Sequence, residues 1–120
     1  MSTKTTEGTL SVAMPESNWH YVRVALQPAD GTSRVPQIGM LSARQLLATL
    51  IGSVHGAIGS GIQIDMLRWD EAKGEGLIRI STGDYGSLKT ALSIATSSLQ
   101  NVMVRMSIVK ASPYAHSLAI

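Results

Sequence analysis

The chain has 120 residues, of which 44% are hydrophobic, and a formal net charge of +2, which fits one folded domain and argues against a disordered chain. It has no Cys, which excludes disulfides and a thiolate metal site, and its three His are too scattered for a zinc site. With ten Lys and Arg and eight Asp and Glu, the chain has a smaller excess of positive charge than is usual for a protein that binds nucleic acid unaided.

The N-terminal residues 1–17 are rich in Ser, Thr and Gly, so we expect a flexible leader there. They lack an apolar segment after a basic one, which argues against a signal peptide. No run of about 18 apolar residues is present that would cross a membrane. The folded domain is predicted over residues 18–110, with a C-terminal tail over residues 111–120.

The first half of the folded part predicts a strand and then a helix. Residues 19–26 are rich in aromatic and β-branched residues that alternate with polar ones, which is typical of a strand. A loop with Pro and Gly follows. Ser42 is a good N-cap for a helix over residues 43–55, where Leu and Ile form an apolar stripe, and a run of glycines is expected to end it.

The second half predicts a hairpin, a second helix and a last strand. Residues 62–69 and 75–81 alternate between apolar and polar residues around a short turn, which predicts two antiparallel strands. Asp84 is a candidate N-cap for a helix over residues 85–98. Residues 102–109 alternate again and predict the last strand.

The order β-α-β-β-α-β predicts the α+β class and, within it, a ferredoxin-like split βαβ sandwich. In that fold a four-stranded antiparallel sheet carries two helices on one face. Right-handed crossovers place the first and third strands in the centre of the sheet. The other face of the sheet is then open to water or to a partner.

The open face is the candidate interaction surface. Alternation directs about one arginine per strand onto it, which favours contact with a phosphate or an acidic partner. An equally simple alternative is that these arginines are solvated, or paired with Asp65 and Glu75. Aromatic residues of the kind that stack RNA bases are missing from the expected positions, so base stacking is not predicted. The candidate residues for contact with RNA or a partner are Tyr21, Arg23, Arg79 and Arg105.

No catalytic, cofactor-binding or metal-binding residue is predicted. The glycine run over residues 55–61 follows a helix, whereas phosphate loops precede one, so we interpret it as a helix-ending turn. His55 has no nucleophile or carboxylate visibly arranged with it and is best explained as a cation at a helix C-terminus. Trp19 and Trp69 flank strand ends and are expected to cover the core.

In this order the segments resemble a known family, the small protein subunits of eukaryotic ribonuclease P and RNase MRP. The resemblance is to the fourteen-kilodalton type and its fungal counterpart, the eighth "processing of precursor" subunit, with the fifth as a relative of the same fold. It spans residues 18–114. The matching segments are Trp19-x-Tyr21, Gln45-Leu46-Leu47 with its glycine turn, Ile64-Asp65-Met66-Leu67 with Trp69, Leu77-Ile78-Arg79-Ile80, Leu88 with Ala91-Leu92, and Val109 with Ser112-Pro113-Tyr114.

The resemblance implies a non-catalytic role. In this family the RNA is the catalyst, and the substrates are precursor tRNA and precursor rRNA. The implied partners are a subunit of the same fold, the thirty-kilodalton TIM-barrel-like subunit and the RNase P and MRP RNAs, in the nucleus and nucleolus. Exposed aliphatic residues such as Leu41 or Ile58 are expected at a protein interface, and the isolated chain is expected to be poorly soluble or self-associating.

Two other functions share this fold. An acylphosphatase-type enzyme would hold phosphate in a glycine loop with an arginine directly after the first strand. The loop over residues 27–34 has one Gly and one Arg there but no evident cradle. A regulatory ligand-binding domain would use a glycine turn in the same place, so the same observation weighs against it.

Overall fold

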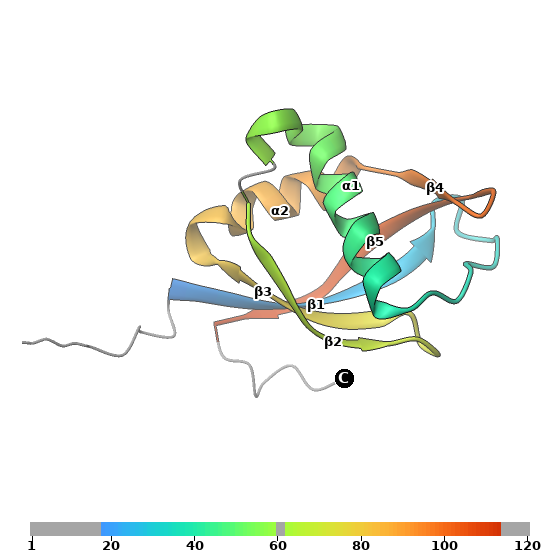
Figure 1. The fold of residues 1–120 in the computed structure, drawn as a ribbon, viewed down its shortest axis with the longest axis horizontal. Helices are drawn as coiled ribbons and strands as arrows, with labels where there is room; N and C mark the ends of the chain where they lie inside the picture. The colour runs from blue at the N-terminus through green and yellow to red at the C-terminus, as the bar shows by residue number, and fades with distance from the viewer. Residues whose placement is uncertain (1–17, 60–61, 114–120) are drawn as a thin grey trace, which may run out of the picture.

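Both helices lie on one face of a single antiparallel sheet, and the other face is left open (Figure 1). This computed structural model describes residues 18–59 and 62–113, so the predicted leader over residues 1–17 lies outside the described residues. The sheet order is β2-β3-β1-β5-β4. The elements are β1 (Trp19–Pro28), α1 (Met40–Gly59), β2 (Ile64–Asp70), β3 (Glu75–Ser81), α2 (Thr82–Ile94), β4 (Ser97–Leu99) and β5 (Val102–Ser112).

The ferredoxin-like prediction is confirmed, including the central position of the first and third strands. β1 pairs antiparallel with both β3 and β5, and β2 pairs with β3 at one end of the sheet. The core lies between the sheet and the helices. Its largest fully buried side chains come from alternate positions of the strands and from the apolar stripes of the helices: Val22, Val24, Leu50, Ile78, Ile80, Leu88, Leu92, Val104 and Met106.

The prediction of four strands is wrong, because a fifth strand, β4, pairs with the start of β5 within the described residues. The second helix was expected to continue to Ser98, but it ends at Ile94, and Ala95 is already extended with φ −78° and ψ 138°. Polar Ser and Thr residues follow and favour extended backbone over helix. Gln100 and Asn101, with φ 49° and 70°, then form a tight turn of the kind that joins hairpin strands.

Several boundaries differ by a few residues from those predicted. α1 begins at Met40 and extends past His55 to Gly59, but Gly56 has a positive φ of 62° that kinks the helix where it was expected to end. Ser81, and not Asp84, holds the N-cap position of α2, and its hydroxyl lies 3.1 Å from the Asp84 carboxylate. β5 runs to Ser112, three residues beyond the predicted end at Val109.

Trp69 covers the core as expected and also fixes the loop before α1. Its indole Nε1 donates a hydrogen bond of 2.8 Å to the carbonyl of Ile38. Trp69 lies opposite Gly76 of β3, and a Cβ added to that glycine would lie only 2.6 Å from the Trp69 ring. The lack of a side chain at Gly76 therefore allows the indole to approach β3 closely.

Candidate interaction surface

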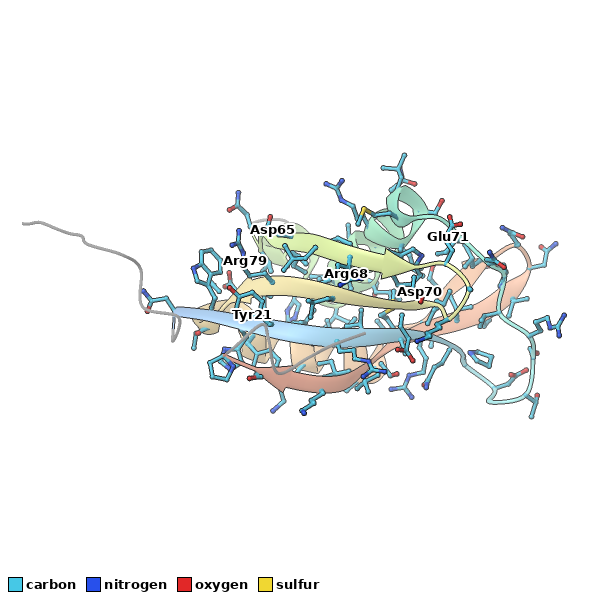
Figure 2. The ribbon with its side chains drawn as sticks, turned by 90° about the horizontal axis from the view of Figure 1, so that it is seen from below. Tyr21, Asp65, Arg68, Asp70, Glu71 and Arg79 are labelled. Carbon is cyan, nitrogen blue, oxygen red and sulfur yellow. The ribbon has the colours of Figure 1, made fainter. Side chains whose placement is uncertain are left out.

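The open face of the sheet presents one row of side chains that crosses three strands. Asp65 of β2 is paired with Arg79 of β3, and Arg79 with Tyr21 of β1. Figure 2 looks onto this face and shows the three side by side. The strand register thus brings two of the predicted contact residues, Tyr21 and Arg79, into direct proximity.

Arg79 is held on both sides by groups of its own chain. Its Nη2 and Nε lie 2.7 and 3.2 Å from the Asp65 carboxylate, and its guanidinium lies over the Trp19 ring at 4.6 Å from the centroid. The hydrogen bond to Asp65 raises the pKa of Arg79 above its ordinary value, so the charge persists at any working pH. Both side chains remain substantially exposed, at 36% for Arg79 and 53% for Asp65.

Arg23 is also paired within the chain. Its Nη2 lies 2.8 Å and its Nε 3.2 Å from the same Glu75 oxygen, and the two side chains are 29% and 23% exposed. The alternative interpretation from the sequence was that the arginines pair with Asp65 and Glu75. Both Arg79 and Arg23 are paired in this way. Much of the positive charge expected on this face is balanced by these carboxylates.

Arg105 lies apart from the other three. It is paired with Gln27 of β1, four residues beyond Arg23, which at 3.3 Å per residue is about 13 Å along the strand. Its neighbours Val104 and Met106 are buried in the core, so Arg105 faces the open side, where no described residue forms an ion pair with it. The three arginines do not form one anion-binding cluster.

Trp19 belongs to this surface, although it was expected to cover the core. It is paired with Ser81 in the same register that pairs Tyr21 with Arg79, so it lies on the open face. Strand alternation contained the signal, because residues two apart share a face. Trp19, Tyr21, Asp65 and Arg79 together form what we call the aromatic corner: a half-exposed surface of flat groups that can pack against a partner.

Comparisons with known proteins place the chain in a family. Residues 18–94, more than half of the chain, match the family of the ribonucleases P/MRP protein subunit Pop8. The chain belongs to the Pop8 family. It is therefore a non-catalytic protein subunit of ribonuclease P and MRP, and the family resemblance noted in the sequence is confirmed.

A solved structure agrees with the fold of this Pop8 family member. A chain of the cryo-EM structure of yeast ribonuclease MRP superimposes with a TM-score of 0.73 at 20% identity, covering 90% of this chain and 83% of that chain. At this identity the similarity establishes the fold alone. No curated protein sequence matches the chain.

The loop after β1 of the Pop8 family member is not built as a phosphate cradle. The Asp30 carboxylate accepts hydrogen bonds from the backbone N–H groups of Thr32 and Ser33, both at 2.9 Å, and from the Ser33 hydroxyl at 2.7 Å. These bonds lower the pKa of Asp30 to about 2. Amides that could face a bound phosphate already face an anionic side chain, which argues against an acylphosphatase-type enzyme.

The remaining candidate, His55, ties the two helices together. Its Nε2 lies 2.9 Å from the carbonyl oxygen of Ser87 on α2, and because that oxygen can only accept, the imidazole nitrogen donates. Within residues 18–59 and 62–113, no three His, Asp or Glu side chains are grouped so that they could hold a metal ion. In the same ranges no helix is long and apolar enough to cross a membrane.

Proposed function

We propose that this chain braces the catalytic RNA of ribonuclease P and MRP together with sibling protein subunits. In this role the RNA performs catalysis, in the 5′ maturation of precursor tRNA and in the processing of precursor rRNA. The observation that carries the proposal is the match of residues 18–94 to the Pop8 family. We further propose that the protein acts in the nucleus and nucleolus.

The proposed partners are a subunit of the same fold and the thirty-kilodalton TIM-barrel-like subunit. The support is chemical as well as familial, because the chain has a formal net charge of only +2. Two of the four arginines on the open face, Arg23 and Arg79, are also paired with carboxylates, while Arg68 and Arg105 form no ion pair with a described residue. Protein interfaces accept such balanced, partly aromatic surfaces readily, whereas RNA backbones require uncompensated cations.

We propose that Tyr21, Arg23, Arg79 and Arg105 lie at a contact of this assembly, with the aromatic corner at its centre. Tyr, Trp and Arg are the residue types that most often dominate protein interfaces. Trp19 and Arg79 are already stacked in the free chain, so little side-chain freedom would be lost when a partner covers them. Arg105, about 13 Å from Arg23 along the strand, would lie towards the rim.

Affinity purification of the tagged full-length chain, followed by RNA sequencing and mass spectrometry, tests the subunit role. We expect the RNase P and MRP RNAs together with the sibling subunits. Recovery of neither RNA above the untagged control would refute the proposal. Microscopy of the tagged chain tests the location, and a signal confined to the cytoplasm would contradict it.

Substitutions on the open face separate protein contact from RNA contact. A chain with Tyr21→Ala and Arg79→Ala should recover less of the sibling subunits and of the RNA in parallel. Loss of RNA with full retention of the siblings would instead indicate direct RNA contact. Lys73→Ala, an exposed cation in the turn between β2 and β3, is the matched control and should change neither.

A further inference from the structure

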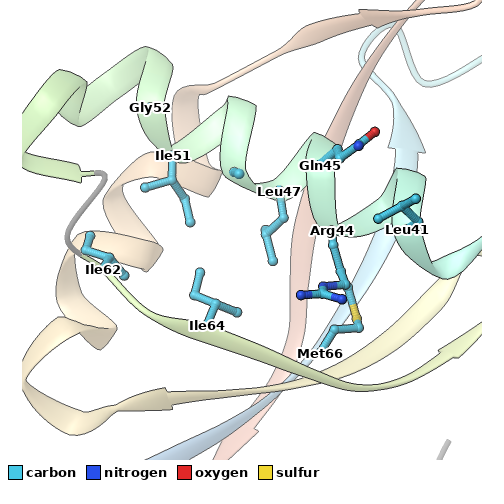
Figure 3. A pocket seen from close by; sticks show the side chains of 10 residues that line it. Leu41, Arg44, Gln45, Leu47, Ile51, Gly52, Ile62, Ile64 and Met66 are labelled. Atoms are coloured by element: carbon cyan, nitrogen blue, oxygen red, sulfur yellow. The ribbon is translucent and has the colours of Figure 1, made fainter.

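An apolar groove lies on the helix side of the molecule, between α1 and the edge strand β2. It has a volume of about 470 Å³ and is lined chiefly by aliphatic side chains from both elements, with Leu47 and Ile51 above and Ile64 and Met66 below (Figure 3). Leu41, at one end of the groove, is 66% exposed. An apolar surface of this kind, next to a free strand edge, is suited to a protein partner.

The strand that borders the groove has an unused edge. β2 pairs with β3 alone and is the terminal strand of the sheet, so its outer backbone groups pair with no described strand. Such an edge is a template for an additional strand. A register shift at Leu67 divides β2 into two regular parts, and the first of them, Ile64–Met66, lines the groove. Alternate side chains of an added strand would point into the groove.

A single cation lies over this apolar surface. Arg44 extends from α1 towards β2, and its guanidinium lies beside Met66 (Figure 3). Among the described residues it has no ion-pair partner, in contrast to Arg23 and Arg79 on the opposite face. Arg44 is exposed in the free chain, and a carboxylate on the incoming strand would complement it; that pair would be stronger than one in open water because the bound strand and the apolar groove would cover it.

A glycine in the middle of α1 leaves room for the same approach. Gly52 lines the groove, and a Cβ added there would meet no atom within 4 Å. Packing within the chain therefore does not require glycine at this position, although glycine weakens a helix. A backbone that approaches α1 closely would require it.

We propose that this groove binds an extended segment of a different protein subunit, which adds as a strand to β2 and places a carboxylate on Arg44. A second copy of the chain fits poorly, because the side chains of β2 on the helix side are Ile64, Met66 and Trp69 and include no carboxylate. The groove lies on the opposite side of the sheet from the aromatic corner. The proposal rests on the subunit role proposed above and adds a second protein contact to it.

Photo-crosslinking in cells tests the proposal with the full-length chain. Photoreactive benzoylphenylalanine at position 41 should crosslink to one extended segment of another protein, in which apolar residues alternate and at least one Asp or Glu is present. The same group at position 90, on the exposed side of α2, is the control and should not yield that peptide. Crosslinks to RNA, crosslinks to a second copy, or no crosslink at position 41 would each overturn the proposal.

Charge reversal then decides whether Arg44 selects the segment. Arg44→Glu should lower the crosslink yield roughly tenfold or more, as expected for a lost charged hydrogen bond. Reversal of the acidic residue of the partner to Lys should restore the yield in the Arg44→Glu chain. An unchanged yield with Arg44→Glu, or no restoration, would contradict the proposed pairing.

Gly52→Ala provides a variant that cannot fail through misfolding of the groove, because the added methyl meets no atom of the chain. It should leave the chain folded and lower the crosslink yield, whereas Gly86→Ala on α2, which also meets no atom, should leave the yield unchanged. Equal yields for both variants would exclude close approach to α1. Recovery of the RNAs with the tagged chain is measured separately, so failure of the groove proposal is distinguishable from failure of the subunit role.

Discussion

Replacement of Gly76 by Ala should destabilise the protein through steric conflict with β2. The added Cβ would lie 2.6 Å from the Trp69 ring, 2.9 Å from the carbonyl of Arg68 and 3.1 Å from the sulfur of Met66. Carbon atoms in ordinary contact are about 3.5–4.0 Å apart. The indole therefore has to move by about 1 Å, and β2 has to move away from β3.

The expected cost can be estimated from the contacts that change. Extra volume in a packed site typically costs about 1–3 kcal/mol. Movement of the indole also weakens the bond from Trp69 Nε1 to the Ile38 carbonyl, which is worth about 1 kcal/mol. We expect the free energy of unfolding to fall by about 2–4 kcal/mol. At about 4–8 °C per kcal/mol for a domain of this size, Tm should fall by roughly 8–32 °C.

Thermal and urea unfolding followed by circular dichroism measure this loss. Gly86→Ala is the matched control, because its Cβ meets nothing within 4 Å, and it should be neutral or slightly stabilising. The cost of Gly76→Ala should shrink in a Trp69→Leu background, where the ring is absent. A free energy of unfolding for Gly76→Ala within about 0.5 kcal/mol of the parent chain would refute the steric explanation.

Three further predictions concern other parts of the molecule. The pKa of Asp30, lowered to about 2 by its hydrogen bonds, lies below its unfolded value, so the stabilisation of the loop by these bonds is present above pH ~4 and is lost as pH falls through 2. The NMR chemical shift of the Ser33 amide should therefore titrate with a midpoint near pH ~2. A midpoint near pH ~4 would contradict the hydrogen bonds. The isolated chain, without the partner segment that would cover the groove, should self-associate non-specifically on a sizing column and become monomeric with Leu41→Asp, since Leu41 is 66% exposed. A parent chain that already elutes as a clean monomer would rule this out. A double-mutant cycle on Asp65 and Arg79 should give a coupling below about 1 kcal/mol because both are exposed, and a coupling above 2 would show that the pair is more than a surface contact.

Strand alternation was sufficient to predict most of the fold. Val22 and Val24 are buried where period-two alternation placed them, and the order of elements determined which strands lie in the centre of the sheet. β4 was not predicted because its three residues come shortly after α2, and the apolar spacing of that helix continues through Leu99. The tight turn at Gln100 and Asn101 also lacks the glycine that usually marks such turns.

The open face was harder to predict because its chemistry depends on register. Asp65 and Arg79 are fourteen residues apart in sequence, and only the pairing of β2 with β3 places them opposite each other. Register shifts in two pairings, at Leu67 between β2 and β3 and beside Arg23 between β1 and β5, change which side chains share a row. The local amino-acid sequence at these positions does not predict such bulges. The candidate residues were therefore identifiable individually, while their partners were not.

The two faces of the molecule use charge differently, and this bears on how a subunit with so little net charge selects its place in an assembly. At and beside the aromatic corner, Arg79 and Arg23 are balanced by carboxylates of the same chain, so a partner there gains little from opposite charge and must be recognised by the shape of the corner. At the groove, Arg44 is exposed and has no such partner among the described residues, and the incoming segment would cover it, so a missing or misplaced carboxylate on that segment would be costly. Discrimination between similar sibling subunits should therefore reside at the groove, while the open face contributes contact area.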